Sequence, residues 1–581
     1  MHQLAAEQQE NFENESRISR SIFKNDAAAL ILLLLLTAAA LLIANPSGNF
    51  PINDDRFYAN AVRSIVETGV LTIEPSNAFD FIPIQLGAMV CKLFGFSYET
   101  LRFTTIAFHL FGISGLYFAL KEFKLADFDA ALLSSIYAFN PLLLNLSLTF
   151  MTDVPALALT NWSFFALIAG IKRQKSKFVI FSVIILSAAM SVRQTALFFL
   201  PAVIISGFLN SKNIKDRVLL LISVLIPLLA YFDLHQWFLQ AQENSASYSN
   251  YSRLLFGALS IFTKPAVILT MTAKASAYFG LALAPATLLL FTKAWRKEFL
   301  KAAIISLLLS TFMVFLPLLF LHAGGSFMPY SLNLFMPPVV GSYCLIGGVP
   351  TWSAEHLKNF TYVTDFLALS FAFCIFFSIF NKGNPESSNL KEEVEELVFI
   401  SSTLICAGAA LVLQLSVSNF DRYYLLALSA FILCLAPAWK RLATGRIKIL
   451  SLLLAIVMAA YATIAAADAM EFLRAQWQAI HRLEQSGIAA ARIDGGPSHI
   501  QSLKIALFRI TFRQGIGWPK RLRGGEERSD MRWWPVLSED YIVATCDLNG
   551  YHRIAEIPYW SPLRLQSRKI FMLEANRLSS K

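Results

Sequence analysis

The segment AALILLLLLTAAALLIA, residues 28–44, is apolar throughout and contains no charged residue. Its length reaches the roughly 17 to 25 residues that a helix needs to cross the hydrocarbon core of a bilayer. Comparable apolar runs follow at 301–321 and 446–467. Helices are expected because, inside lipid, every backbone N–H and C=O must pair within its own segment. The sequence therefore predicts a protein built from membrane-spanning helices.

The composition of the whole chain supports this prediction. Of its 581 residues, 56% are hydrophobic and 15% are charged, whereas a soluble globular protein carries about 25% charged residues. The formal net charge of +10 could indicate nucleic-acid binding, but Lys and Arg lie mainly in short connectors between apolar segments. This distribution reflects membrane topology and predicts no nucleic-acid partner.

Hydropathy predicts about thirteen spans in the chain. They are expected near 28–44, 101–120, 130–147, 154–171, 178–191, 195–210, 217–235, 265–292, 301–321, 362–380, 397–416, 423–438 and 446–467. Alternate connectors are rich in Lys and Arg, such as KRQKSK (172–177), whereas the others are longer and poorer in them. By the positive-inside rule the basic connectors face the cytoplasm. The N-terminus is then cytoplasmic and the C-terminal tail lies outside.

The sequence predicts an all-α polytopic membrane protein with a small C-terminal extracytoplasmic α/β domain. The parts are a cytoplasmic segment at 1–27, a transmembrane domain at 28–467 with outer loops 45–100 and 322–361, and an extracytoplasmic domain at 468–581. The tail is polar and rich in Arg, and its runs YIVATC (541–546) and RKIFML (568–573) are typical of strands. The long loop 322–361 contains several Gly and Pro residues, and we expect it to be a mobile flap.

Four polar clusters interrupt the apolar pattern, and the topology derived from charge places all four on the outer side. They contain Asp54 and Asp55 within 53–69, Asp153 at the start of a span, Arg193 and Gln194 in a short turn, and Arg422 and Tyr423 at the start of another span. Each alone has a structural explanation: a carboxylate can cap a helix, Arg can snorkel to the interface, and Tyr is common in the aromatic belt. Charges near spans, however, usually face a bundle interior or a wet cavity. Their common side therefore predicts a functional site.

These residue types suit the transfer of a group from a lipid phosphate. An arginine can hold phosphate with fork-like hydrogen bonds, and a carboxylate can take the proton from an attacking hydroxyl. Paired carboxylates could also hold a divalent metal ion with waters, although nothing in the sequence requires a cofactor. No histidines are paired at helical spacing, so zinc is not expected.

Several of these segments resemble the motifs of GT-C glycosyltransferases. Asp54–Asp55–Arg56–Phe57–Tyr58 resembles the D-[DE]-x-x-Y signature of the first outer loop, and the most similar branches are the protein O-mannosyltransferases and the bacterial lipid A aminoarabinose transferases. The pair Thr152–Asp153, the stretch from Arg193 to Pro201, and DRYYL at 421–425 are similar to further landmarks of that superfamily. The resemblance extends over essentially the whole chain.

The resemblance implies roles for individual residues. Asp54 would be the acidic residue closest to the acceptor, Asp55 would occupy the second acidic position, and Asp153 would be a supporting carboxylate. Arg193 and Arg422 would contact the donor phosphate. Tyr58, Gln194 and Tyr423 would support the substrates. The reaction implied is an inverting transfer of a hexose or pentose from a polyprenyl-phosphate donor.

The sequence thus predicts a membrane glycosyltransferase of a bacterial-type cytoplasmic (inner) membrane, acting on its extracytoplasmic face. A glycolipid, a polysaccharide or a protein could be the acceptor. A multi-span transporter or lipid flippase is the alternative, and it would place charges near the middle of spans. Asp54, Asp153, Arg193 and Arg422 instead lie at span ends. A non-catalytic scaffold, with these residues as caps and anchors only, is a third hypothesis.

Overall fold

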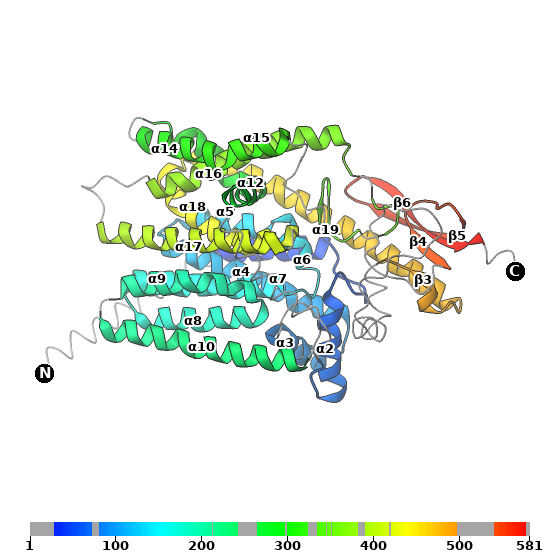
Figure 1. The fold of residues 1–581 in the computed structure, drawn as a ribbon. Coiled ribbons are helices and arrows are strands. Elements are labelled where there is room, and N and C mark those ends of the chain that lie inside the picture. The colour runs from blue at the N-terminus through cyan, green and yellow to red at the C-terminus, as the bar shows by residue number, and fades with distance from the viewer. Residues whose placement is uncertain are drawn as a thin grey trace.

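The structure is a computed structural model, and most of the chain is a bundle of helices with a sheet at one end (Figure 1). It describes residues 28–72, 81–211, 213–241, 264–296, 299–323, 334–343, 345–349, 351–380, 390–417, 420–496 and 540–576. The cytoplasmic segment predicted at 1–27 and much of the tail between 497 and 539 therefore lie outside the described residues.

Each of the segments predicted as a span is helical. In chain order the helices of the bundle are Ala28–Ile43, α4 (Tyr98–Glu122), α5 (Asp127–Ala138), α6 (Pro141–Leu146), α7 (Asp153–Lys172), α8 (Ser176–Val192), η1 (Gln194–Phe199), α9 (Leu200–Asn210), α10 (Ile214–Ala241), α12 (Pro265–Ala282), α13 (Ala284–Lys293), α14 (Leu300–Ser310), η4 (Thr311–Phe315), α15 (Leu316–Ala323), α16 (Ala354–Phe380), α17 (Leu390–Val417), η5 (Asp421–Ala427), α18 (Leu428–Leu442) and α19 (Gly445–Gln485). Within the described residues, seven helices are long and apolar enough to cross a membrane, or eight if the bent pair α12–α13 is one span.

Two predicted spans are not continuous helices. The span expected at 130–147 is divided into α5 and α6 at Asn140, whose side chain accepts hydrogen bonds from Leu142 N and Leu143 N. The span expected at 265–292 bends by 95° between α12 and α13. A proline, Pro141 or Pro285, follows each break, and proline lacks the N–H that would continue the helix. In Figure 1, α12 is seen nearly end-on while α9, α10 and α17 run across the picture.

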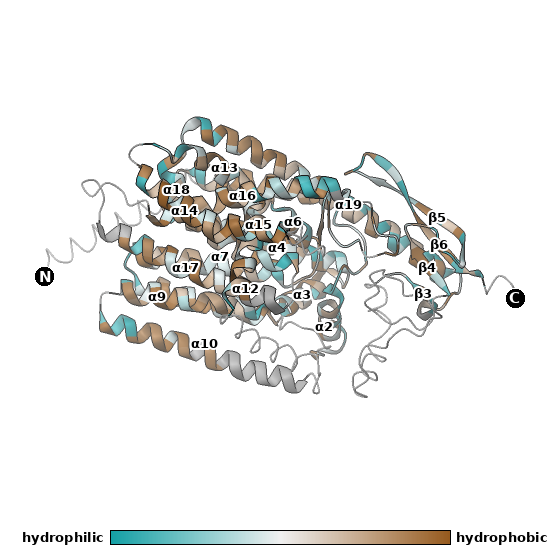
Figure 2. Ribbon diagram, turned by 45° about the horizontal axis from the view of Figure 1, so that its top comes forward, coloured by the Kyte–Doolittle hydropathy of each residue, from teal (hydrophilic) through white to brown (hydrophobic). Residues whose placement is uncertain are grey.

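The connectors predicted to be cytoplasmic meet at one end of the bundle. Lys172 Nζ lies 2.7 Å from Glu396 Oε1, and Lys448 Nζ lies 2.7 Å from Asp129 Oδ2. Glu396 ends the connector 381–396, which contains KEEVEE (391–396) and is an acidic exception among the predicted cytoplasmic connectors. Its carboxylate is therefore compensated by a neighbouring basic connector. Figure 2 shows long apolar stretches on α9 and α17 and on the coloured part of α10.

The opposite end of the bundle carries two short helices from the first outer loop, α2 (Asp55–Thr68) and α3 (Phe81–Phe94). The apolar stripe of α2, which includes Tyr58, Val62 and Ile65, is buried, as its helical spacing predicts. Helix α3 is apolar and packs against α2 and α4. The sequence prediction placed it only in a loop, because it is too short to read as a span.

The C-terminal sheet has the strand order β3–β4–β6–β5. Its strands are β3 (Ile493–Asp494), β4 (Tyr541–Ala544), β5 (Tyr551–Ser561) and β6 (Gln566–Ala575). The strands predicted in 541–546 and 568–573 are thereby confirmed. Helix α19 runs for 41 residues through the domain boundary predicted at 468 and carries the sheet on its outer part. At that point the buried Asp468 accepts hydrogen bonds from Tyr343 Oη and Ser561 Oγ.

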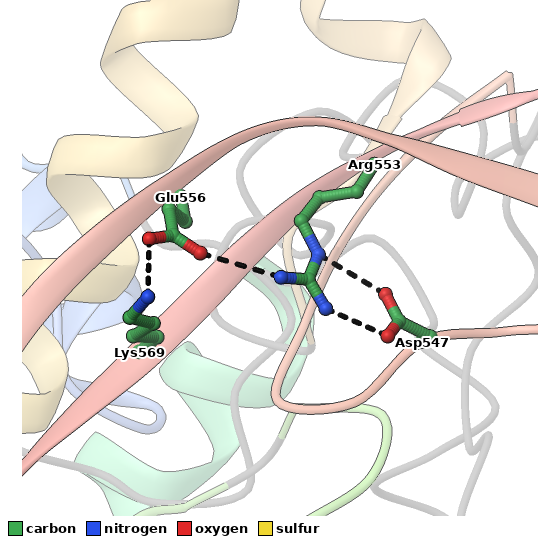
Figure 3. A network of polar contacts seen from close by, with 4 residues as sticks. All are labelled: Asp547, Arg553, Glu556 and Lys569. Carbon is green, nitrogen blue, oxygen red and sulfur yellow. Dashed lines mark hydrogen bonds and ion pairs between the residues drawn. The ribbon is translucent and has the colours of Figure 1, made fainter.

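An exposed network of charged side chains holds the β5–β6 pair together, as Figure 3 shows. Arg553 donates to both carboxylate oxygens of Asp547 and to Glu556, which also accepts from Lys569. The network lies where the register of β5 shifts between Arg553 and Ala555. It therefore fixes the loop before β5 against an irregular part of the sheet.

The described part of the loop predicted to be a flap is anchored. It contains the short strands β1 (Phe335–Met336) and β2 (Val339–Val340). Leu334 N and Phe335 N donate to Asp421 Oδ2, at 3.1 and 2.9 Å. Thr545 N donates to Ile346 O at 2.9 Å. These bonds tie residues 334–346 to η5 and to the C-terminal sheet, whereas residues 324–333 lie outside the described residues.

Candidate functional site

The structure brings the first and last polar clusters together. Arg422 Nη2 lies 3.3 Å from Asp54 Oδ2, although the two residues are 368 positions apart. Asp54 precedes α2 and its side chain is 40% exposed, while the Arg422 side chain is 16% exposed. The acidic group at the start of the first outer loop is thus held beside the start of η5.

The second and third clusters form an equivalent pair. Arg193 Nη1 lies 2.5 Å from Asp153 Oδ1 and donates also to Thr152 Oγ1 at 3.2 Å. Asp153 opens α7 and is 4% exposed. Arg193 is the last residue before η1. Both arginines therefore stand beside the first turn of a 3₁₀ helix that continues into a longer α-helix, α9 in one case and α18 in the other.

A single tyrosine joins the two pairs. The guanidinium carbon of Arg193 lies 5.1 Å and that of Arg422 lies 5.6 Å from the centre of the Tyr423 ring. Both distances are within the range for a cation–π interaction. Arg193, Arg422, Asp153 and Tyr423 line one cavity, of about 20 Å³, together with Thr195. Three of the four polar clusters thus line this cavity, and the first cluster is joined to it only by its ion pair with Arg422.

Several polar atoms around this cavity are buried and, among the described residues, have no hydrogen-bond partner. They are Asp153 Oδ2, Thr195 Oγ1, Arg422 Nε and, next to the cavity, Gln194 Nε2. Buried polar groups are almost always paired with protein or water, because an unpaired one costs about 1–3 kcal/mol. This group of four atoms therefore indicates a place where water or a polar ligand binds.

Asp55 has surroundings unlike those of Asp54. Its side chain is fully buried and accepts hydrogen bonds from Ile52 N, at 2.8 Å, and Phe150 N, at 3.4 Å. Burial raises the pKa of Asp55 to about 7, against the opposing effect of the nearby Arg102 cation. Asp55 is not among the residues that line the cavity. It fixes the polypeptide around Asp54 instead of reaching the cavity.

Two buried residues to which the sequence prediction gave no role, one of them within the DRYYL stretch, position this site. Arg102, near the start of α4, is fully buried and donates to the carbonyls of Pro46, Gly48 and Phe50. Asp421 is 1% exposed and holds Leu334 and Phe335. Both are charged residues at span ends, which is the signal that could have identified them. Of the predicted supporting residues, Tyr58 is buried on α2.

The acidic pair does not form a metal site in this arrangement. Asp55 directs its oxygens at two backbone N–H groups, whereas Asp54 pairs with Arg422. No cluster of three His, Cys, Asp or Glu side chains that could hold a metal ion is found among the residues that the structure describes. The residues present therefore do not fit a divalent ion shared by Asp54 and Asp55.

Fold and site together define a polytopic membrane protein with a charged cavity at one end of its helical bundle. Residues 85–235 match the family model described as dolichyl-phosphate-mannose-protein mannosyltransferase. The match confirms the resemblance to GT-C glycosyltransferases over this part of the chain. It includes Asp153, Arg193 and Gln194, whereas Asp54 and Arg422 lie outside it. No curated protein sequence matches the chain.

Two kinds of solved structure are similar to this one. The apo oligosaccharyltransferase of Archaeoglobus fulgidus has 13% sequence identity and a TM-score of 0.37, over 77% of this chain and 56% of that chain. ArnT from Cupriavidus metallidurans bound to undecaprenyl phosphate has 12% identity and a TM-score of 0.38, over 84% of this chain and 74% of that chain. This chain thus spans little more than half of the archaeal protein.

Proposed function

We propose that the protein transfers a monosaccharide from a polyprenyl-phosphate donor to an acceptor hydroxyl on the extracytoplasmic face of a bacterial-type cytoplasmic membrane. The observation that carries the proposal is a cavity lined by Arg193, Arg422 and Asp153, with unpaired polar atoms around it. A second carboxylate, that of Asp54, reaches this site through its ion pair with Arg422. The family match over residues 85–235 gives the reaction class. The extracytoplasmic face is proposed because the predicted topology has a cytoplasmic N-terminus and an extracytoplasmic C-terminal domain.

The two arginines would hold the donor phosphate. A guanidinium group presents fork-like donors that match phosphate oxygens, and such charge-assisted bonds are about twice as strong as neutral ones. Arg422 Nε has no hydrogen-bond partner among the described residues, so it could donate a further hydrogen bond to an oxygen of the phosphate. Thr195 Oγ1 and Gln194 Nε2 are further unpaired groups beside the same cavity.

Asp54 would act as the general base. The acceptor oxygen forms a bond to the anomeric carbon of the sugar, the bond from that carbon to the phosphate oxygen breaks, and the acceptor proton passes to Asp54. The phosphate leaves as a monoester with one more negative charge, which Arg193 and Arg422 stabilise. Attack from the face opposite the phosphate inverts the anomeric centre. Asp153 would orient Arg193 through their ion pair.

The ion pairs explain how the donor would switch the site on. A cavity of about 20 Å³ has room for roughly one water molecule, so the donor head group enters only if the side chains move. Phosphate competes with Asp54 for Arg422, and its binding separates this pair. Asp54 is then free to accept a proton. The cavity thus holds its base inactive until the donor is in place.

The test is complementation by Asp54→Asn. Mass spectrometry of cell-envelope glycans from a strain that lacks the protein identifies the missing modification. The wild-type protein should restore it, and Asp54→Asn should restore less than about 1% of it, since general base catalysis contributes about 10²–10⁴-fold. Asp547→Asn, an equal charge change on the exposed sheet network, is the matched control and should restore it fully. Complete restoration by Asp54→Asn, at an equal protein level in the membrane, would refute the proposal.

A further inference from the structure

A second, larger cavity lies between the loop that precedes Asp54 and the outer part of α19. Its volume is about 650 Å³, within the roughly 300–1,000 Å³ that is usual for small-molecule sites. On one side are Asn49 and Phe50, and on the other are residues of α19 between Arg474 and Gln485. None of its lining residues takes part in the arginine-lined cavity.

Among the described residues that line this cavity, the charged side chains are basic and none is a carboxylate. Arg474, His481 and Arg482 lie within three turns of α19. Arg474 is held by the carbonyls of Asn45 and Ser47 and by Glu471. Arg482 forms no ion pair within the described part of the chain and is exposed. Arg482 is thus a cation that no acidic side chain compensates within the described residues, and such a cation favours an anionic ligand.

The remaining lining suits a saccharide. The rings of Phe50 and Trp477 are stacked, with centres 6.4 Å apart and an angle of 12° between planes. The His481 ring lies 5.7 Å from that of Trp477. Aromatic side chains combine a broad apolar face with adjacent polar groups, and they can pack against the C–H face of a sugar ring. Asn49, Gln478 and Gln485 supply amide donors and acceptors for hydroxyl groups.

The loop links the second cavity rigidly to the proposed base. Phe50 lines the cavity, and Asp54 follows four residues later, which is at most about 14 Å of extended chain. Arg102 fixes this loop through the carbonyls of Pro46, Gly48 and Phe50. A ligand in the second cavity would therefore be held at a defined position near the reacting centre.

We infer that the second cavity binds the acceptor and that the acceptor is an anionic saccharide. Its carboxylate or phosphate group would lie at Arg474 and Arg482, and its hydroxyl groups at the amide side chains beside the buried Phe50–Trp477 pair. The inference rests on the proposed function for its role in transfer. The saccharide would present a hydroxyl towards Asp54. Among the predicted classes of acceptor, it favours a charged polysaccharide or glycolipid head group over a neutral protein side chain.

Calorimetric binding to the full chain in zwitterionic nanodiscs tests the inference. The probes are tetragalacturonate, maltotetraose as its neutral counterpart, and inorganic phosphate as an isolated anion. We expect tetragalacturonate to bind at least tenfold more tightly than either other probe. Arg482→Gln should weaken that binding at least fivefold. Lys569→Gln, which removes an exposed cation from the sheet network, is the matched control and should leave it unchanged.

Three results would overturn the inference: equal binding of tetragalacturonate and maltotetraose, equally tight binding of inorganic phosphate, or unchanged binding by Arg482→Gln. The proposed function is judged separately by Asp54→Asn. If Asp54→Asn abolishes transfer while Arg482→Gln binds tetragalacturonate like the wild type, only the acceptor inference fails. If Asp54→Asn retains transfer while Arg482→Gln loses tetragalacturonate, the cavity is a saccharide site and only the proposed mechanism fails.

Discussion

The two cavities at the end of the molecule that carries the sheet differ in how their cations are compensated. In the small cavity Arg193 and Arg422 already face Asp153 and Asp54, and about 20 Å³ remains between the side chains. In the large cavity of about 650 Å³, Arg482 has no acidic partner among the described residues. Where each arginine already has a carboxylate partner, a bound phosphate can replace that partner during a reaction. The large cavity is compensated only in part, because Arg474 pairs with Glu471 whereas Arg482 does not. Its uncompensated cation can attract a charged ligand, so the two cavities suit chemistry and recognition respectively.

The largest expected effect follows from removing a cation of the small cavity. Arg422→Ala should lower kcat/KM for the donor by about 10³-fold or more, because it removes phosphate contacts and leaves Asp54 without its partner. Arg482→Ala, the matched change in the large cavity, should raise the acceptor KM about tenfold with little change in kcat. Steady-state kinetics with each substrate varied would show the difference. If both variants lowered kcat equally, the assignment of different roles to the two cavities would be contradicted.

A substitution of arginine by lysine should show whether a cavity needs the shape of the guanidinium group or only its positive charge. Arg193→Lys keeps the cation but loses the planar guanidinium group, whose Nη1 contacts both Thr152 and Asp153 and whose other nitrogens could hold phosphate. We expect kcat to fall about 10- to 100-fold. Arg482→Lys should keep acceptor KM within about threefold, since its cation serves mainly as a charge. If Arg193→Lys were fully active, bidentate phosphate binding by Arg193 would be contradicted.

Asp55 should affect stability more than it affects the chemistry of the small cavity. Because its pKa is raised from 3.8 to about 7 in the folded protein, the folded state retains a proton that the unfolded state has lost between these values. The free energy of unfolding should therefore fall as the pH rises from about 4 to 7. This group contributes up to about 1.4 kcal/mol per pH unit to that fall, and nothing further above pH 7. Thermal unfolding of Asp55→Asn should lack this contribution to the slope. Asp547→Asn is the matched control, and an unchanged slope for Asp55→Asn would contradict the assignment.

The smallest expected effect is that of salt. Raising NaCl from 0.05 to 0.5 M should weaken tetragalacturonate binding in the large cavity severalfold, because its exposed charges are screened. Binding of undecaprenyl phosphate should change less, since the arginines of the small cavity are mostly buried. Titrations at the two salt concentrations give both values. A steeper salt dependence for the lipid than for the saccharide would reverse the comparison.

The arrangement of the small cavity could be predicted from sequence, because the alternation of basic and non-basic connectors places Asp54, Asp153, Arg193 and Arg422 at the same ends of their helices. The different burial of Asp54 and Asp55 could not. Neighbouring residues at a helix start point in different directions, and Asp55 is enclosed partly by Phe150, which is remote in sequence. Only the fold determines which of the two pairs with Arg422.

The large cavity could not be predicted from the sequence either. Hydropathy predicts that the last span ends near 467, but α19 continues to Gln485 because Phe472, Ile480 and Leu483 are buried on its outer part. The cavity exists because this extension meets the loop before Asp54. Likewise, the breaks at Asn140 and Leu283 depend on local caps and prolines within apolar runs, which a hydropathy window averages away.

Photo-crosslinking is the most direct test of the claim that the small cavity is the donor-phosphate site. An undecaprenyl phosphate analogue with a diazirine near its phosphate would be irradiated with the full chain in nanodiscs, and the crosslinked peptides identified by mass spectrometry. We predict crosslinks within 193–199 and 421–427, lost in Arg422→Ala and retained in Asp54→Asn. Crosslinks that map elsewhere, or that persist undiminished in Arg422→Ala, would contradict the account.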